Sequence, residues 1–409
     1  MLSEEISPLE QARKRVRRAK RDVRSELSVT GGDWQRGGLA QRPELLAVDA
    51  VRDTLPRVDA RVVSQAQFAE RFEKTRIPCL IINAMEAWPA AAQGGDRQWT
   101  WPGLRRRLGG HRFKVGSDDD GFAVRLSLEH FLSYLDDPVA GASCDDSPLY
   151  VFDGTFGEKE GSKALLEDFS VPAYFAEDLL ALAGNKKRPP FRWVVFGPAR
   201  SGSSLHIDPL ATSAWNALLV GTKRWALLPP GVPREACKPR GAGFDGEAVT
   251  WFDRVLPATQ SAAWSHARPI EGVQRAGEIM FVPSGWWHAV LNVQDTACVT
   301  QNFASSANLA DVWRHTRKAR PRLAAIWRDA LQAARPDLMA VLAHADADGR
   351  PVSESSPSST SSSSSAFSDE EMPVDGGDPA ELGSKRMPST CAGHELAEQG
   401  APWRRRCAT

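Results

Sequence analysis

Residues 204–209 read Ser-Leu-His-Ile-Asp-Pro, which places a histidine and an aspartate two positions apart. In a β-strand, the side chains of residues i and i+2 point to the same face. We therefore expect His206 and Asp208 to converge on one point inside a β-structure. An imidazole and a carboxylate are two parts of the two-histidine, one-carboxylate site that holds non-haem Fe(II) and leaves coordination positions open. Alone, such a pair is more often a hydrogen-bonded structural pair.

A third ligand must come from another strand, and His288 is the obvious candidate. It follows a Pro-Ser-Gly turn at 283–285 and stands at the start of a predicted strand. The other histidines lie in polar, inserted or low-complexity surroundings, at 111, 130, 266, 315, 344 and 394. The combination predicts a metal centre made of His206, Asp208 and His288, with no catalytic side chain beyond it.

The surrounding segment has the pattern of an all-β domain. Between 192 and 302, short apolar runs alternate with Gly and Pro, at 193–196, 205–208, 213–219, 224–228, 279–282, 288–292 and 296–303. Many short strands separated by turn signals indicate a β-barrel or sandwich. Residues 231–272 interrupt the series, and we expect them to form a long insertion.

The rest of the chain divides by composition. We predict a basic N-terminal arm and linker at 1–60, an α/β region packing on the barrel at 61–190, the β core at 191–306 and a helical region at 307–345. Within the second of these, residues 169–182 are expected to be one helix. Residues 346–409 are expected to be disordered, because residues 353–368 contain eleven Ser among sixteen and large apolar side chains are scarce.

Charge is balanced over the chain but not along it. Lys+Arg and Asp+Glu both total 51, so the formal net charge is zero, which argues against a uniformly basic nucleic-acid-binding protein. Residues 13–24 nevertheless contain eight Lys/Arg among twelve, and a second basic cluster occupies 314–322. Two interpretations of residues 13–24 have equal weight. The segment either contacts RNA or directs nuclear localisation, or it is the solvated face of a helix. The cluster at 314–322 is by default a solvated helix face.

Lys223 is a candidate for binding an anionic co-substrate. An Fe(II) site with three protein ligands can accept a bidentate 2-oxo acid and dioxygen, and the distal carboxylate of that acid needs a cation. Lys223 lies in an apolar β-run, where burying an ammonium without a partner is costly. The alternative, a lysine at a turn beside Gly221, has equal weight on these residues alone.

Several longer runs resemble a known family, and they lie at 147–153, 165–169, 188–193, 197–202, 206–216, 285–288 and 300–306. Over residues 12–327 the sequence resembles the Jumonji-C (JmjC) 2-oxoglutarate oxygenases, and especially members that combine arginine demethylation with lysyl hydroxylation. The resemblance implies an α+β fold built on a double-stranded β-helix, a cupin-like jelly roll, with flanking N- and C-terminal helices. It implies Fe(II) on His206, Asp208 and His288, and dioxygen and 2-oxoglutarate as co-substrates, the latter bound by Lys223, Thr300, Asn216 and Tyr150.

The resemblance further implies an enzyme that acts on protein side chains. We expect lysyl hydroxylation of nuclear proteins, namely splicing-related Arg/Ser-rich proteins and also histones. Demethylation of methyl-arginine in histones at the same site ranks second, because a methyl-ammonium cage uses several aromatic faces and the chain has only 3 Tyr. Trp or Phe could take the place of Tyr in such a cage. We expect a nuclear location, with the cytoplasm as a second one, and no membrane association. A homo-oligomer is left open.

Two alternatives belong to other classes of protein. The basic clusters at 13–24 and 314–322 would serve an RNA- or chromatin-binding module in which the barrel is incidental. A cupin that binds Zn or Mn and has no oxygenase activity would use the same three ligands.

Overall fold

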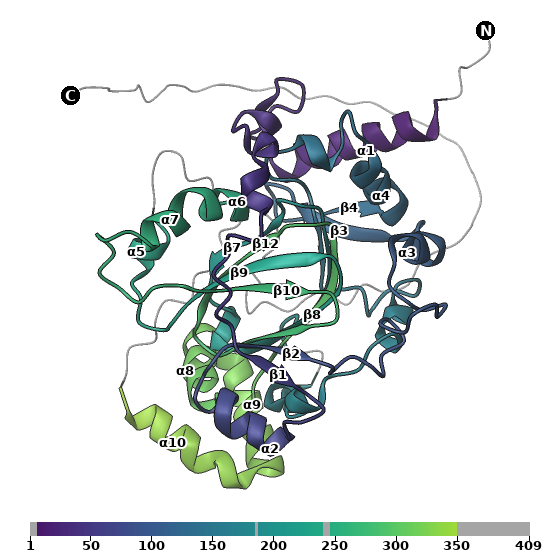
Figure 1. Ribbon diagram of the computed structural model, residues 1–409. Helices are drawn as coiled ribbons and strands as arrows, with labels where there is room; N and C mark the ends of the chain where they lie inside the picture. The colour runs from purple at the N-terminus through teal and green to yellow at the C-terminus, as the bar shows by residue number, and fades with distance from the viewer. Residues whose placement is uncertain (1–5, 185–186, 240–245, 350–409) are drawn as a thin grey trace, which may run out of the picture. The chain divides into compact units, whose positions relative to one another are not determined.

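The computed structural model describes residues 6–184, 187–239 and 246–349. Two β-sheets form its centre, and helices surround them (Figure 1). The larger sheet has the strand order β1-β2-β11-β8-β13-β6-β5. Its strands are β1 (Arg57–Asp59), β2 (Cys79–Ile82), β5 (Val151–Asp153), β6 (Arg192–Gly197), β8 (Ser213–Val220), β11 (Ile279–Val282) and β13 (Thr296–Phe303).

The smaller sheet has the order β10-β9-β12-β7 and crosses the middle of Figure 1. Its strands are β7 (Gly202–His206), β9 (Thr222–Leu228), β10 (Ile270–Arg275) and β12 (Trp287–Asn292). A separate hairpin pairs β3 (Arg112–Ser117) with β4 (Ala123–Ser127). An apolar cluster joins the two main sheets, with Trp225 and Val290 from the smaller and Met280 from the larger. This arrangement confirms the predicted double-stranded β-helix.

Two differences from the expected strands bear on the site. β10 was not predicted, and it begins inside the segment 231–272 that the sequence assigned to an insertion. β7 ends at His206, so Asp208 lies beyond the strand in which it was expected.

The helices are α1 (Pro8–Val23), α2 (Gln65–Phe68), α3 (Trp101–Leu108), α4 (Leu128–Asp136), α5 (Arg234–Cys237), α6 (Ala248–Thr250), α7 (Leu256–Thr259), α8 (Leu309–Ala319), α9 (Pro321–Ala334) and α10 (Met339–Ala347). The last three pack together, around Trp313 and Trp327. α10 extends the predicted helical region two residues into 346–409. The remainder of the predicted disordered tail, from residue 350 onward, lies outside the described residues.

The helix predicted at 169–182 is wrong. Short 3₁₀ turns at Ala173–Phe175 and Leu179–Ala183 replace it. Pro172 precedes the first turn and has no backbone N–H to donate within a helix. The apolar residues that suggested the helix are still buried, among them Phe175 and Leu179.

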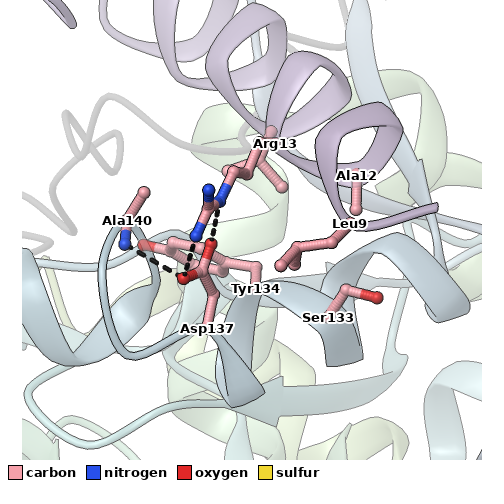
Figure 2. Close-up of a pocket in the computed structure, with 8 residues that line it drawn as sticks. Leu9, Ala12, Arg13, Ser133, Tyr134, Asp137 and Ala140 are labelled. Carbon is pink, nitrogen blue, oxygen red and sulfur yellow. Dashed lines mark hydrogen bonds and ion pairs between the residues drawn. The ribbon is translucent and has the colours of Figure 1, made fainter. Parts of the chain in front are cut away.

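α1 is docked onto the fold by its basic side chains. Its N-terminus carries a capping box formed by Ser7 and Glu10. Arg13 donates to both carboxylate oxygens of Asp137, at 2.7 and 2.9 Å, beside a small pocket between α1 and α4 (Figure 2). The hydrogen bond from Arg13, which outweighs the opposing effect of burial, holds the pKa of Asp137 well below its usual value.

Two further basic residues of this segment are turned inward. Lys20 forms a buried ion pair with Asp145, and Arg24 pairs with Glu247 at 3.0 Å. Of the eight basic residues at 13–24, these two and Arg13 therefore connect α1 to the rest of the fold. In the described ranges, no helix has both the length and the apolar character that crossing a membrane requires.

Candidate metal centre and co-substrate pocket

Strand pairing brings the three predicted metal ligands together. His206 at the end of β7 is the antiparallel register partner of His288 on β12, and their ring centroids are 4.1 Å apart. Nε2 of His288 lies 3.9 Å from Oδ2 of Asp208. One ligand atom from each of the three residues lies within 4.8 Å of the others, so the predicted convergence is confirmed.

Asp208 reaches this point by a different route from the one expected. The strand has already ended, and Asp208 (φ −58°, ψ 145°) stands immediately before the 3₁₀ turn Pro209–Ala211. Its backbone is still extended, so the alternation that places residues i and i+2 on one face continues past the last ladder hydrogen bond.

Both imidazoles are oriented by backbone carbonyl groups. Nδ1 of His206 is 2.8 Å from the carbonyl oxygen of Ser204, and Nδ1 of His288 is 3.1 Å from that of Trp286. A proton on Nδ1 satisfies each contact and leaves Nε2 as the free ligand atom. Such bonds to the second nitrogen are the usual means by which proteins fix metal-binding histidines.

The electrostatics of the cluster fit a divalent cation. Burial lowers the pKa of His206 to about 3, so this imidazole is neutral, as a metal ligand must be. Burial raises the pKa of Asp208. Oδ2 of Asp208 is buried and has no hydrogen-bond partner in the described part of the chain. A bound cation would give this carboxylate the compensating charge that it lacks, so the three residues fit the predicted iron.

Asn216 and Thr300 lie side by side on neighbouring strands of the larger sheet. They are register partners on β8 and β13. The amide of Asn216 donates to Sγ of Cys298 at 3.6 Å, and its Oδ1 is buried with no hydrogen-bond partner among the described residues. The Thr300 hydroxyl donates to the carbonyl oxygen of Trp215 at 2.9 Å. Asn216 therefore keeps a free acceptor, whereas Thr300 must rotate its hydroxyl to donate to a ligand.

Lys223 is buried, which removes the alternative of an exposed lysine at a turn. Its side chain is only 3% exposed, and its ammonium donates to Oδ1 of Asn292 at 2.8 Å. Trp225, two residues along the same strand, stacks on the ring of His288 with centroids 6.2 Å apart. Lys223 and the metal ligands therefore occupy the same interior.

Tyr150 lies just before β5. Its ring meets Phe152 edge-on, with centroids 6.3 Å apart. It packs against a cluster that includes Leu218 and Cys298. These two residues are each two positions from Asn216 or Thr300, so Tyr150 packs on the sheet face that carries Asn216 and Thr300.

Asn292 is the residue of this site that sequence reasoning missed. It lies at the end of β12, four residues after His288. Because His288 and Asn292 are an even number of residues apart on one strand, their side chains lie on the same face. A polar Asn at this position of an apolar strand could therefore have indicated a residue of the site.

Comparison with known proteins agrees with this geometry. Residues 193–303 match the family model of the JmjC domain, hydroxylase. The chain is 42% identical over 334 residues, covering 80% of both chains, to the bifunctional arginine demethylase and lysyl-hydroxylase psr-1 of Caenorhabditis briggsae. It is 37% identical over 289 residues to the arginine-specific demethylase JMJ22 of Arabidopsis thaliana, covering 70% of this chain and 52% of that protein. It is 29% identical over 294 residues to the human 2-oxoglutarate and iron-dependent oxygenase JMJD4, covering 66% of each.

Proposed function

The chain belongs to the JmjC-domain hydroxylases, and we propose that it is an Fe(II)- and 2-oxoglutarate-dependent dioxygenase that hydroxylates lysine side chains of other proteins. The observation that carries the proposal is the cluster of His206, Asp208 and His288 inside a jelly roll that also buries Lys223. Relatives named as lysyl-hydroxylases and as 2-oxoglutarate and iron-dependent oxygenases support it.

The protein's own residues divide the work of binding. His206, Asp208 and His288 would hold the iron, which when bound couples the oxidation of 2-oxoglutarate by dioxygen to the oxidation of a substrate C–H bond. Lys223 would bind the distal carboxylate of 2-oxoglutarate, with Tyr150, Thr300 and Asn216 completing the pocket. The apolar walls contributed by Trp225, Leu227, Met280 and Val290 exclude water and strengthen these charged contacts.

The same site can in principle carry out two reactions. Oxidation of a lysine side-chain carbon gives a stable hydroxylysine. Oxidation of an N-methyl carbon of methyl-arginine gives a product that breaks down to formaldehyde and the demethylated amine. The second is the alternative function, and the name of the psr-1 relative contains both activities.

The positions of the three tyrosines favour lysyl hydroxylation. Tyr134 is buried and donates its hydroxyl to Asp145, and Tyr174 donates to the carbonyl oxygen of Val63 at 2.6 Å. Of the three, Tyr150 packs against the cluster that includes Leu218 and Cys298, next to Asn216 and Thr300. A cage of several tyrosines around a methylated cation therefore cannot form at the metal centre.

Mass spectrometry of a peptide library distinguishes the two reactions. After incubation with Fe(II), ascorbate and 2-oxoglutarate, we expect lysine-containing peptides to gain one oxygen atom. Peptides with methyl-arginine should keep their mass, and little formaldehyde should form. Loss of a methylene mass from methyl-arginine with no oxygen gain on lysine would replace the hydroxylase by the demethylase.

For substrates, we propose Arg/Ser-rich splicing proteins and histone tails, which implies residence in the nucleus. The exposed basic side chains of α1 support nuclear entry, because such clusters are typical of localisation signals. Imaging the tagged chain with and without these side chains tests the location, and equal cytoplasmic signal in both would contradict it.

A second candidate function, RNA binding, is favoured by one surface of α1. Lys14, Arg15, Arg17, Arg18 and Arg21 are all exposed, and four of them follow the helical spacing of a single face. The cluster at 314–322 is a weaker candidate, since the Arg314 side chain is mostly buried and pairs with Asp311 and Asp348, and His315 is also buried.

Replacing Lys14, Arg15 and Arg17 by Gln should weaken the binding of single-stranded RNA. Each phosphate contact removed should flatten the dependence of the logarithm of affinity on the logarithm of salt concentration by about 0.7. Affinity is measured by fluorescence anisotropy at several salt concentrations. Gln at 318, 320 and 322 serves as the control with the same charge change. An unchanged salt slope in the α1 variant would contradict RNA binding by this surface.

A further inference from the structure

Lys223 is held by an amide group and not by a carboxylate. Its ammonium donates to Oδ1 of Asn292, which is its register partner in the pairing of β9 with β12. Within the described residues, no acidic side chain forms an ion pair with Lys223. Asn292 thus orients the buried ammonium group of Lys223 without neutralising its charge.

The orientation of the Asn292 amide is fixed from both ends. An ammonium can only donate, so Oδ1 must face Lys223. On the other side, Nδ2 of Asn292 is 2.9 Å from Oγ of Ser201, whose hydroxyl donates to the carbonyl oxygen of Pro198 at 2.6 Å. Because the Ser201 proton is used in that bond, its oxygen accepts from Nδ2. Asn292 and Ser201 are each only 1% exposed, so water does not compete for these bonds.

Gly197 provides the space that this amide occupies. A Cβ atom on residue 197 would lie 2.3 Å from Nδ2 of Asn292 and 2.7 Å from Oγ of Ser201. Both distances are well below van der Waals contact, so any side chain at 197 would displace the amide. The support for Lys223 therefore extends through Asn292 and Ser201 to the end of β6.

We propose that Asn292 is a positioning residue that holds the Lys223 ammonium ready for the distal carboxylate of a 2-oxo dicarboxylic acid. The inference rests on the proposed function, in which Lys223 receives 2-oxoglutarate. A carboxylate at 292 would form an ion pair with Lys223 and compete with the ligand for its charge. The amide fixes the direction of the ammonium and leaves its charge for the ligand. Asn292 therefore sets the preference for 2-oxo acids that carry a second carboxylate.

The test compares the full chain with its Asn292→Asp variant, both loaded with Mn(II) so that no turnover occurs. Water-proton relaxation reports the binding of 2-oxoglutarate and of pyruvate, which has the same 2-oxo acid group and no distal carboxylate. We expect Asn292→Asp to weaken 2-oxoglutarate binding by roughly tenfold or more, the scale of a charge-assisted contact, and to leave pyruvate and Mn(II) binding unchanged. Gln294→Glu adds the same charge at an exposed position two residues away and should change neither affinity.

A second variant tests the same support without changing any charge. Gly197→Ala should displace the amide and also lower the ratio of 2-oxoglutarate to pyruvate affinity, by less than Asn292→Asp does. A general loss of structure would weaken the binding of 2-oxoglutarate, pyruvate and Mn(II) together. A change in the ratio of the two ligand affinities therefore indicates loss of the positioning of Lys223 and not loss of folding. If Asn292→Asp does not fold, Gly197→Ala alone decides the question.

Lys223→Ala separates the inference from the function on which it rests. If this variant binds 2-oxoglutarate as the wild type does, Lys223 is not the carboxylate partner and the proposed pocket is wrong. If Lys223→Ala loses the preference for 2-oxoglutarate while Asn292→Asp and Gly197→Ala keep it, the pocket stands and the positioning role of Asn292 is overturned.

Discussion

Replacing His206 by Ala is expected to abolish the release of succinate from 2-oxoglutarate. The substitution removes one of three ligand side chains that lie within 4.8 Å of one another. Loss of an outer partner of a metal ligand already costs about 10–100-fold in affinity or activity. Loss of a ligand itself should therefore cost more than roughly a thousandfold.

Metal content measured beside turnover shows whether the loss has this cause. The wild type should bind Fe(II) and gain thermal stability from it, because a ligand that binds only the folded state stabilises that state. His206→Ala should show neither effect. His266→Ala is the matched control, since His266 is exposed in the segment between β9 and β10. Equal succinate release by His206→Ala and the wild type would remove the enzyme from consideration and leave the binding module.

Asp145→Ala should lower the free energy of unfolding by about 3–5 kcal/mol, the usual cost of removing one partner of a buried ion pair. Asp145 is fully buried and accepts from Lys20, the Tyr134 hydroxyl and the Gln35 amide. The Lys20 ammonium also lies 4.9 Å from the centroid of the Trp34 ring. Burial lowers the pKa of Lys20, so loss of the carboxylate leaves an ammonium in surroundings that disfavour its charge.

Urea denaturation of two variants distinguishes this explanation from a general effect of charge. Asp22→Ala also removes an acid beside α1, but its pairs with Arg18 and Arg21 lie at the surface and should contribute less than about 1 kcal/mol. Replacing Lys20 by Met in addition to Asp145→Ala should recover part of the lost stability, because no charge is then left buried. A loss below about 1 kcal/mol for Asp145→Ala would contradict a structural role for this pair.

The metal centre could be predicted because its signals are local. His206 and Asp208 are two residues apart, and His288 follows a recognisable turn. Lys223 was ambiguous in the sequence because its burial depends on β9 lying between β10 and β12. β10 itself escaped prediction, since it follows a long segment of short helices and its first residues lie in the stretch that was assigned to an insertion.

The supporting contacts could not be predicted because they join residues that are distant in the sequence. Asn292 and Ser201 are separated by 91 positions, and neither has a neighbour in the sequence that indicates the other. The basic segment at 13–24 gave no sign of which side chains turn inward. Arg13 meets Asp137 only because α1 packs on α4, a tertiary contact with no local pattern.

We propose that this metal centre transfers an oxygen atom from dioxygen to a protein lysine. The most direct measurement is mass spectrometry of a lysine peptide after reaction under dioxygen enriched in the heavy isotope. We predict that the oxygen gained by lysine carries that isotope, that succinate forms with it, and that His206→Ala shows neither product. Oxygen on lysine that comes from water, or lysine that stays unmodified while the wild type consumes 2-oxoglutarate, would contradict the claim.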